Sequence, residues 1–111
     1  MNKEIIKKLD FKKGDGLIPV VVQDFTSKDL LMLAYVNKAA LKKTLETGYA
    51  HYWSRSRKKL WMKGESSGNT QKIKKILTDC DYDTIVYLVI QKGPACHTKK
   101  STCFHNIVSE N

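Results

Sequence analysis

The chain has 111 residues, 41% of them hydrophobic, so we expect one domain with a hydrophobic core over residues 1–111. Lys and Arg total 20 against 11 Asp and Glu, and the net charge of +9 favours an anionic partner. Three cysteines are an odd number for a secreted disulfide framework, and no apolar run approaches the roughly 18 residues of a membrane span. We therefore expect a cytoplasmic protein without a signal peptide or membrane segment.

The first half of the chain predicts two strands and a helix. Residues 1–15 are charged and are compatible with a short helix or a loose arm. Residues 17–23 are rich in β-branched side chains and residues 30–36 are apolar. We predict two paired strands there, with a buried helix as the alternative for the second. Asn37 and Gly48 are the expected caps of an amphipathic helix over residues 38–47.

The second half predicts further strands and two long loops. Residues 49–53 predict an aromatic strand, residues 60–62 an extended segment and residues 64–69 a loop rich in Gly and Ser. Residues 84–90 give the clearest strand pattern. If residues 72–78 are extended rather than helical, residues 79–83 form a hairpin turn. The whole predicts an α+β domain with a small, mostly antiparallel β-sheet and one or two helices.

All three cysteines lie in two short segments, with Cys80 in the first and Cys96 and Cys103 in the second. Thiolates suit zinc, and three protein ligands with an open position are typical of catalytic zinc sites. His97 and His105 lie close to the second pair, where either could complete the site or act as a base. Small buried thiols without a metal are the alternative.

Asp79, Asp81 and Asp83 alternate along the first of these segments. On an extended backbone their side chains would point to one side. Three neighbouring carboxylates repel one another unless a cation neutralises them, which favours Mg²⁺ or Ca²⁺. An acidic turn without a metal is the alternative. The calcium-loop template fails, because Thr84 stands where that template requires Gly.

Residues 52–61 alternate aromatic, hydroxyl and cationic side chains. Arginines can clamp a phosphate, and the adjacent loop offers hydroxyls and free N–H groups to an anion. The same composition suits RNA binding. Trp53 and Trp61 are expected in the core rather than stacked on a base.

Residues 16–104 resemble the phosphoribosyl-AMP cyclohydrolase family of histidine biosynthesis. The resemblance rests on the joint occurrence of residues 51–57, 60–71, 79–83 and 96–98, with Cys103 and Phe104. Enzymes of this family hydrolyse the purine ring of phosphoribosyl-AMP between ring nitrogen 1 and carbon 6. The resemblance implies a metal-dependent hydrolase with the same reaction, and no fused pyrophosphohydrolase domain in these residues.

The resemblance also implies the ligands of two metals. Zinc would be bound by Cys80, Cys96 and Cys103, and magnesium by Asp79, Asp81 and Asp83. Zinc would generate the hydroxide that attacks carbon 6. Its site would be shared between the two chains of a homodimer.

The remaining expectations concern the substrate. The ligand would be a phosphorylated nucleotide, not a nucleic acid or a membrane. His97 is the expected proton carrier, with orientation of a metal ligand as its alternative role. The phosphates would contact Arg55, Arg57, Lys63, Ser66, Ser67 and Asn69.

Two positions depart from the family's usual pattern. Tyr82 stands where Gly is common, and His105 follows Phe104 where another aromatic is more usual. A zinc-stabilised RNA-binding domain is the alternative function, favoured by the charge and by the aromatic, basic segment. The alternating aspartates argue against it, because carboxylates repel phosphate unless a cation bridges them.

Overall fold

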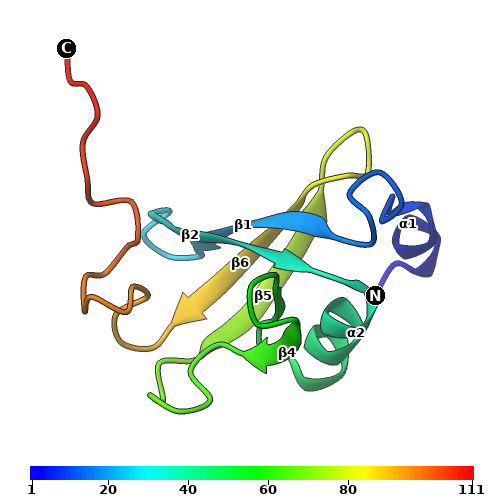
Figure 1. The fold of residues 1–111 in the computed structure, drawn as a ribbon, viewed down its shortest axis with the longest axis horizontal. Coiled ribbons are helices and arrows are strands. Elements are labelled where there is room, and N and C mark those ends of the chain that lie inside the picture. The colour runs from blue at the N-terminus through cyan, green and yellow to red at the C-terminus, as the bar shows by residue number, and fades with distance from the viewer.

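The computed structural model describes residues 1–111 as a four-stranded sheet, a two-stranded hairpin and two helices (Figure 1). In chain order the elements are α1 (Lys3–Lys8), β1 (Ile18–Asp24), β2 (Leu30–Val36), α2 (Lys38–Thr47), β3 (His51–Ser54), β4 (Lys59–Met62), β5 (Gln71–Thr78) and β6 (Ile85–Gln91). Neither helix has the length and apolar character that crossing a membrane requires.

The larger sheet has the strand order β2-β1-β6-β5. β1 pairs antiparallel with β2, and β5 pairs antiparallel with β6. The central pair, β1 and β6, is parallel. Parallel neighbours need a long crossover connection, and here α2 and the β3–β4 hairpin lie in it. The prediction of a small α+β domain with a mostly antiparallel sheet is confirmed.

α2 begins and ends at the predicted caps. The Asn37 side chain accepts a hydrogen bond from the Ala40 amide at 2.8 Å, and Gly48 closes the helix with a φ of 78°. Such a positive φ is open to Gly because it has no Cβ. Ala40, Leu41 and Thr44 are buried, so this face of the helix covers the core.

One face of the sheet and the β3–β4 hairpin enclose the core. Ile18, Val20 and Val22 of β1 alternate into it and are fully buried. Tyr52 of β3 lies in the same cluster, and its hydroxyl donates a hydrogen bond to Gln71 of β5. This hydrogen bond connects the β3–β4 hairpin to β5 of the larger sheet.

The undecided segments take definite structures. Residues 1–15 contain the short helix α1. Asn2 caps its start, because the Asn2 side chain accepts a hydrogen bond from the Ile5 amide at 3.2 Å. Residues 72–78 are extended within β5 and residues 30–36 form β2. Residues 79–83 therefore form the predicted hairpin turn.

Candidate metal and substrate site

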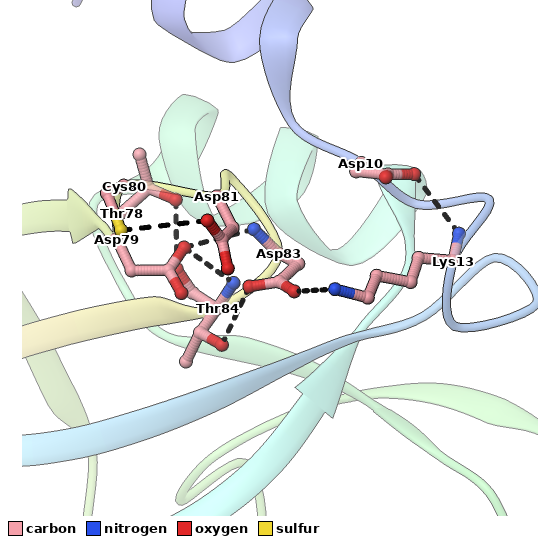
Figure 2. Close-up of polar contacts among 8 residues, drawn as sticks. All are labelled: Asp10, Lys13, Thr78, Asp79, Cys80, Asp81, Asp83 and Thr84. Carbon is pink, nitrogen blue, oxygen red and sulfur yellow. Dashed lines mark hydrogen bonds and ion pairs between the residues drawn. The ribbon is translucent and has the colours of Figure 1, made fainter.

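The turn between β5 and β6 gathers three carboxylates (Figure 2). One side-chain oxygen from each of Asp79, Asp81 and Asp83 lies within 4.8 Å of the others. Asp79 also closes the turn, because its Oδ1 accepts hydrogen bonds from the amides of Asp83 at 3.1 Å and Thr84 at 3.3 Å. Three convergent carboxylate oxygens are the kind of ligand set that hard cations such as Mg²⁺ prefer.

The route to this cluster differs from the prediction. The three side chains were expected to share one side of an extended strand, but residues 80–83 turn sharply. Tyr82 has a positive φ of 60°, a conformation that favours Gly. The resemblance therefore marked a position where the backbone takes a left-handed conformation, which Gly adopts with the least strain.

Lys13 supplies a positive charge to this cluster. Its Nζ lies 2.6 Å from Asp83 Oδ2, and this hydrogen bond lowers the pKa of the Asp83 carboxyl and raises the pKa of Lys13. The Asp10 side chain accepts from the Lys13 amide at 3.1 Å, and the Asp10 amide donates to the Tyr82 carbonyl at 2.8 Å. The segment after α1 is thus held against the acidic turn.

Cys96 and Cys103 meet in the loop after β6. Each thiol shifts the pKa of the other, so the two lie near one another, and the Cys103 amide donates a hydrogen bond to the Leu31 carbonyl at 2.8 Å, which fastens the loop to β2. A tight turn over residues 96–99 closes with the Lys99 amide donating to the Cys96 carbonyl at 2.9 Å. Two of the three predicted zinc ligands therefore lie together within one chain.

The two thiols differ in acidity. The Thr98 hydroxyl lies 3.0 Å from Cys96 Sγ. Hydrogen bonds from this hydroxyl and from the Thr98 backbone lower the pKa of Cys96 to about 6, with smaller contributions from His105 and Cys103. Burial raises the pKa of Cys103, and the neighbouring Cys96 raises it further. Cys96 is thus a thiolate at neutral pH, the form that binds metals. The donor set fits zinc.

Cys80 lies at the opposite end of the sheet from this pair. It precedes β6 and Cys96 follows it (Figure 1), and the seven residues of β6 span about 20 Å at roughly 3.3 Å each. Thiolates on one tetrahedral zinc lie within about 4 Å of one another, because each Zn–S bond is about 2.3 Å. One chain therefore does not bring its three cysteines together.

A cleft of about 350 Å³ opens beside the hairpin. Its walls include Tyr35, Trp53, Arg57, Lys59 and Trp61. Both tryptophans are half-buried, so the prediction of core tryptophans holds in part: Trp61 packs against the core, and Trp53 faces the cleft.

Arg55 stacks near this cleft. Its guanidinium carbon lies 3.9 Å from the centre of the Tyr35 ring, which is within cation–π range. Tyr35 was not anticipated, because only folding brings the end of β2 beside the hairpin turn.

Lys63 connects the loop after β4 to the thiol loop. Its Nζ donates a hydrogen bond to the Ala95 carbonyl at 2.7 Å, directly before Cys96. Gln91 donates to the Asn69 carbonyl at 3.3 Å, and so holds the other end of the same loop. The predicted phosphate-binding loop and the predicted metal loop are therefore adjacent.

The family model described as phosphoribosyl-AMP cyclohydrolase matches residues 32–105. The chain belongs to this family. A Clostridium botulinum (strain 657 / Type Ba4) relative is 56% identical over 93% of this chain and 94% of its own. An Archaeoglobus fulgidus relative is 62% identical over 81% of this chain and 83% of its own. A Cenarchaeum symbiosum relative is 54% identical over 91% of this chain and 94% of its own. Each of the three is called phosphoribosyl-AMP cyclohydrolase.

The family match confirms the predicted resemblance, and the matched segment contains every predicted site residue. The structure separates two of the histidines by their contacts. His97 is exposed, whereas His105 Nε2 lies 3.9 Å from Cys96 Sγ and 3.4 Å from the Thr98 hydroxyl. Thr98 was not among the predicted site residues, although a hydroxyl two residues after a cysteine is a readable signal for a contact with the thiol. Ser66 and Ser67 lie exposed in the loop beside the cleft.

Proposed function

We propose that this protein hydrolyses the adenine ring of 1-(5-phosphoribosyl)-AMP between nitrogen 1 and carbon 6, in histidine biosynthesis. One water is consumed. Its oxygen bonds to carbon 6, the bond between nitrogen 1 and carbon 6 breaks, and nitrogen 1 takes a proton, so that carbon 6 becomes a carboxamide. The ribosyl group on nitrogen 1 gives the ring positive character and favours attack. Membership of the family carries this proposal.

The donor sets support two metals of different character. Zinc is proposed to bind Cys96 and Cys103 of one chain together with Cys80 of a second chain in a homodimer. When bound, zinc lowers the pKa of a coordinated water to about 7 and so supplies the nucleophile at neutral pH. Thr98 holds Cys96 as a thiolate, and Lys63 holds the loop in place through Ala95.

Magnesium is proposed to bind the carboxylates of Asp79, Asp81 and Asp83, and to hold or position a substrate phosphate. Lys13 occupies one oxygen of Asp83, so a cation at this site displaces an ammonium group that already neutralises part of the charge. The turn keeps the three carboxylates convergent through the two hydrogen bonds that the Asp79 side chain accepts from the amides of Asp83 and Thr84.

The phosphates of the substrate are proposed to meet the basic groups around the cleft. Arg57 lines the cleft, and the stacked Arg55 keeps its N–H groups available at the edge of the guanidinium. Lys63, Ser66, Ser67 and Asn69 complete the set in the adjacent loop. The aromatic walls of the same cleft offer a surface for the purine.

Proton transfer is assigned to His97. It is exposed next to Cys96, and histidine is the side chain that most often transfers protons in enzyme active sites. The ring of His105 is engaged with Cys96 and Thr98, so its role is to hold the thiolate.

The test is the fate of the water oxygen. The protein, supplied with Zn²⁺ and Mg²⁺, is incubated with phosphoribosyl-AMP in water enriched in the heavy oxygen isotope, and the product is analysed by mass spectrometry. We expect the mass of one added water, with the heavy oxygen in the carboxamide. Release of an intact adenine ring, or no conversion, would contradict the proposal. A Cys96→Ala variant is the matched control for contaminating activity.

A further inference from the structure

The segment after Cys103 is an arm whose apolar side chains are largely uncovered. Phe104 is 58% exposed, Ile107 74% and Val108 102%. Cys103 is fastened to β2, and residues 104–111 are here called the arm. After the contacts of His105 with Cys96 and Thr98, the arm runs away from the body of the chain (Figure 1). Grouped apolar side chains exposed in this way mark contact surfaces.

A largely apolar groove of about 590 Å³ lies between α1, α2 and β5. Its lining includes Ile5, Ile6, Leu9, Leu45, Ile73 and Leu77. All six residues from 73 to 78 contribute to it. The register of β5 shifts between Ile73 and Lys75, and beyond that shift alternate side chains point to opposite faces. Because the consecutive residues 75–78 all line the groove, it runs along the edge of the strand.

The edge of β5 that faces the groove is open. β5 is the outermost strand of its sheet. At the start of its outer edge, the Ala50 amide donates a hydrogen bond to the Gln71 carbonyl, and the Ile73 amide donates one to the Gly48 carbonyl. No backbone hydrogen bond reaches this edge beyond Ile73. Open strand edges readily accept an additional strand, and an extended segment that carries exposed apolar side chains suits that role.

The arm and the groove are brought together by the shared zinc site, and in this respect the inference rests on the proposed function. Thr78 and Ile85, at the two ends of the turn that carries Cys80, both line the groove. If Cys103 of one chain lies within about 4 Å of Cys80 of a second, the arm starts at the second chain's groove. Its five residues from 104 to 108 span about 16 Å when extended, comparable to residues 73–78.

The charges of the two surfaces are complementary. Lys74 and Lys75 are exposed along β5 and line the groove. The arm contains one acidic side chain, Glu110, and no Lys or Arg. Complementary charges guide the orientation of docking. The basic edge of β5 also disfavours pairing between two β5 strands, so that an acidic arm is the better occupant.

We propose that the arm of each chain docks into the groove of a second copy of this chain, with Phe104, Ile107 and Val108 covering the apolar walls and the backbone following β5. The exchange of arms holds the Cys80 turn of one chain beside the Cys96–Cys103 pair of the other. The dimer is therefore assembled by the arms and does not depend on zinc alone.

Photo-crosslinking locates the arm directly. A photoreactive phenylalanine analogue replaces Ile107 in an unlabelled chain, which is co-assembled with a chain labelled uniformly with heavy nitrogen. We expect cross-links from the unlabelled arm to labelled peptides containing residues 1–9 or 71–78. Cross-links confined to unlabelled peptides, cross-links to other segments, or none at all would overturn the proposal.

The second measurement is the dimer dissociation constant by sedimentation. Ile107→Asp should raise it about tenfold or more, because a large apolar side chain loses its contact. Asn106→Asp adds the same charge one residue earlier and should leave it within about twofold. Equal constants for both variants would overturn the proposal. If the protein is an active, zinc-bridged dimer but neither measurement gives the expected result, the docking of the arm is refuted and the shared zinc site is not. If the protein is active as a monomer, both the docking of the arm and the shared zinc site are refuted.

Discussion

Two inactive variants are expected to restore activity in each other. Cys80→Ala removes the ligand on the β5–β6 turn, and Cys103→Ala removes one ligand of the loop after β6. In a dimer that shares its sites, each variant alone lacks one thiolate at both sites. A mixed dimer contains one site with all three cysteines, because the Cys103→Ala chain still supplies Cys80 and the Cys80→Ala chain supplies the other two.

The expected magnitude follows from the distance between the two ends of β6. At about 20 Å, Cys80 of one chain is several times too far from its own Cys96 for a common zinc ion. Random pairing of equal amounts makes half of the dimers mixed, and each of these has one intact site of two. Turnover and tightly bound zinc should therefore both reach about a quarter of the wild-type values.

The assay co-expresses the two variants from one vector with different tags and measures phosphoribosyl-AMP turnover and zinc content. The matched control is a mixture of Cys96→Ala and Cys103→Ala chains, which damage the same half of the site and should remain inactive. Equal turnover in both mixtures would refute the shared site. So would a Cys80→Ala protein that keeps its zinc.

Three further predictions concern single residues. Lys63→Met frees the loop at Ala95, so zinc affinity should fall roughly tenfold in a competition titration, whereas Lys63→Arg should restore part of it. In the metal-free protein, alkylation of Cys96 should rise with pH through a midpoint near 6, and Thr98→Val should move that midpoint upward because it removes the hydrogen bond that lowers the thiol pKa. An unmoved midpoint would exclude Thr98 as the cause. Asp81→Asn should raise the Mg²⁺ concentration needed for half-maximal turnover severalfold with an unchanged melting temperature, since Asp81 closes no backbone hydrogen bond of its turn; an unchanged Mg²⁺ requirement would remove it from the site.

Local signals predicted the elements that they control. Asn37 and Gly48 mark the ends of α2 because caps are chemical requirements of a helix end. The β-branched run from Leu17 predicted β1, and the clear pattern from Thr84 predicted β6. The parallel pairing of these two strands was beyond reach, because it depends on the crossover through α2 and the hairpin rather than on either segment.

The candidate site shows the same division. The sequence predicted that the three aspartates converge, but on an extended strand. In the structure a turn with a left-handed backbone at Tyr82 brings them together. The contacts of Lys63 with Ala95 and of Arg55 with Tyr35 join residues more than 15 positions apart in sequence. No local pattern contains such contacts, since they arise only when the sheet and the hairpin pack together.

The measurement that tests the central claim most directly is phosphoribosyl-AMP turnover, followed by ultraviolet absorbance, before and after removal of zinc with a chelator. We predict ring hydrolysis that stops on chelation and returns when Zn²⁺ is added back in the presence of Mg²⁺. A folded, dimeric, zinc-loaded protein that does not open the ring would contradict the account.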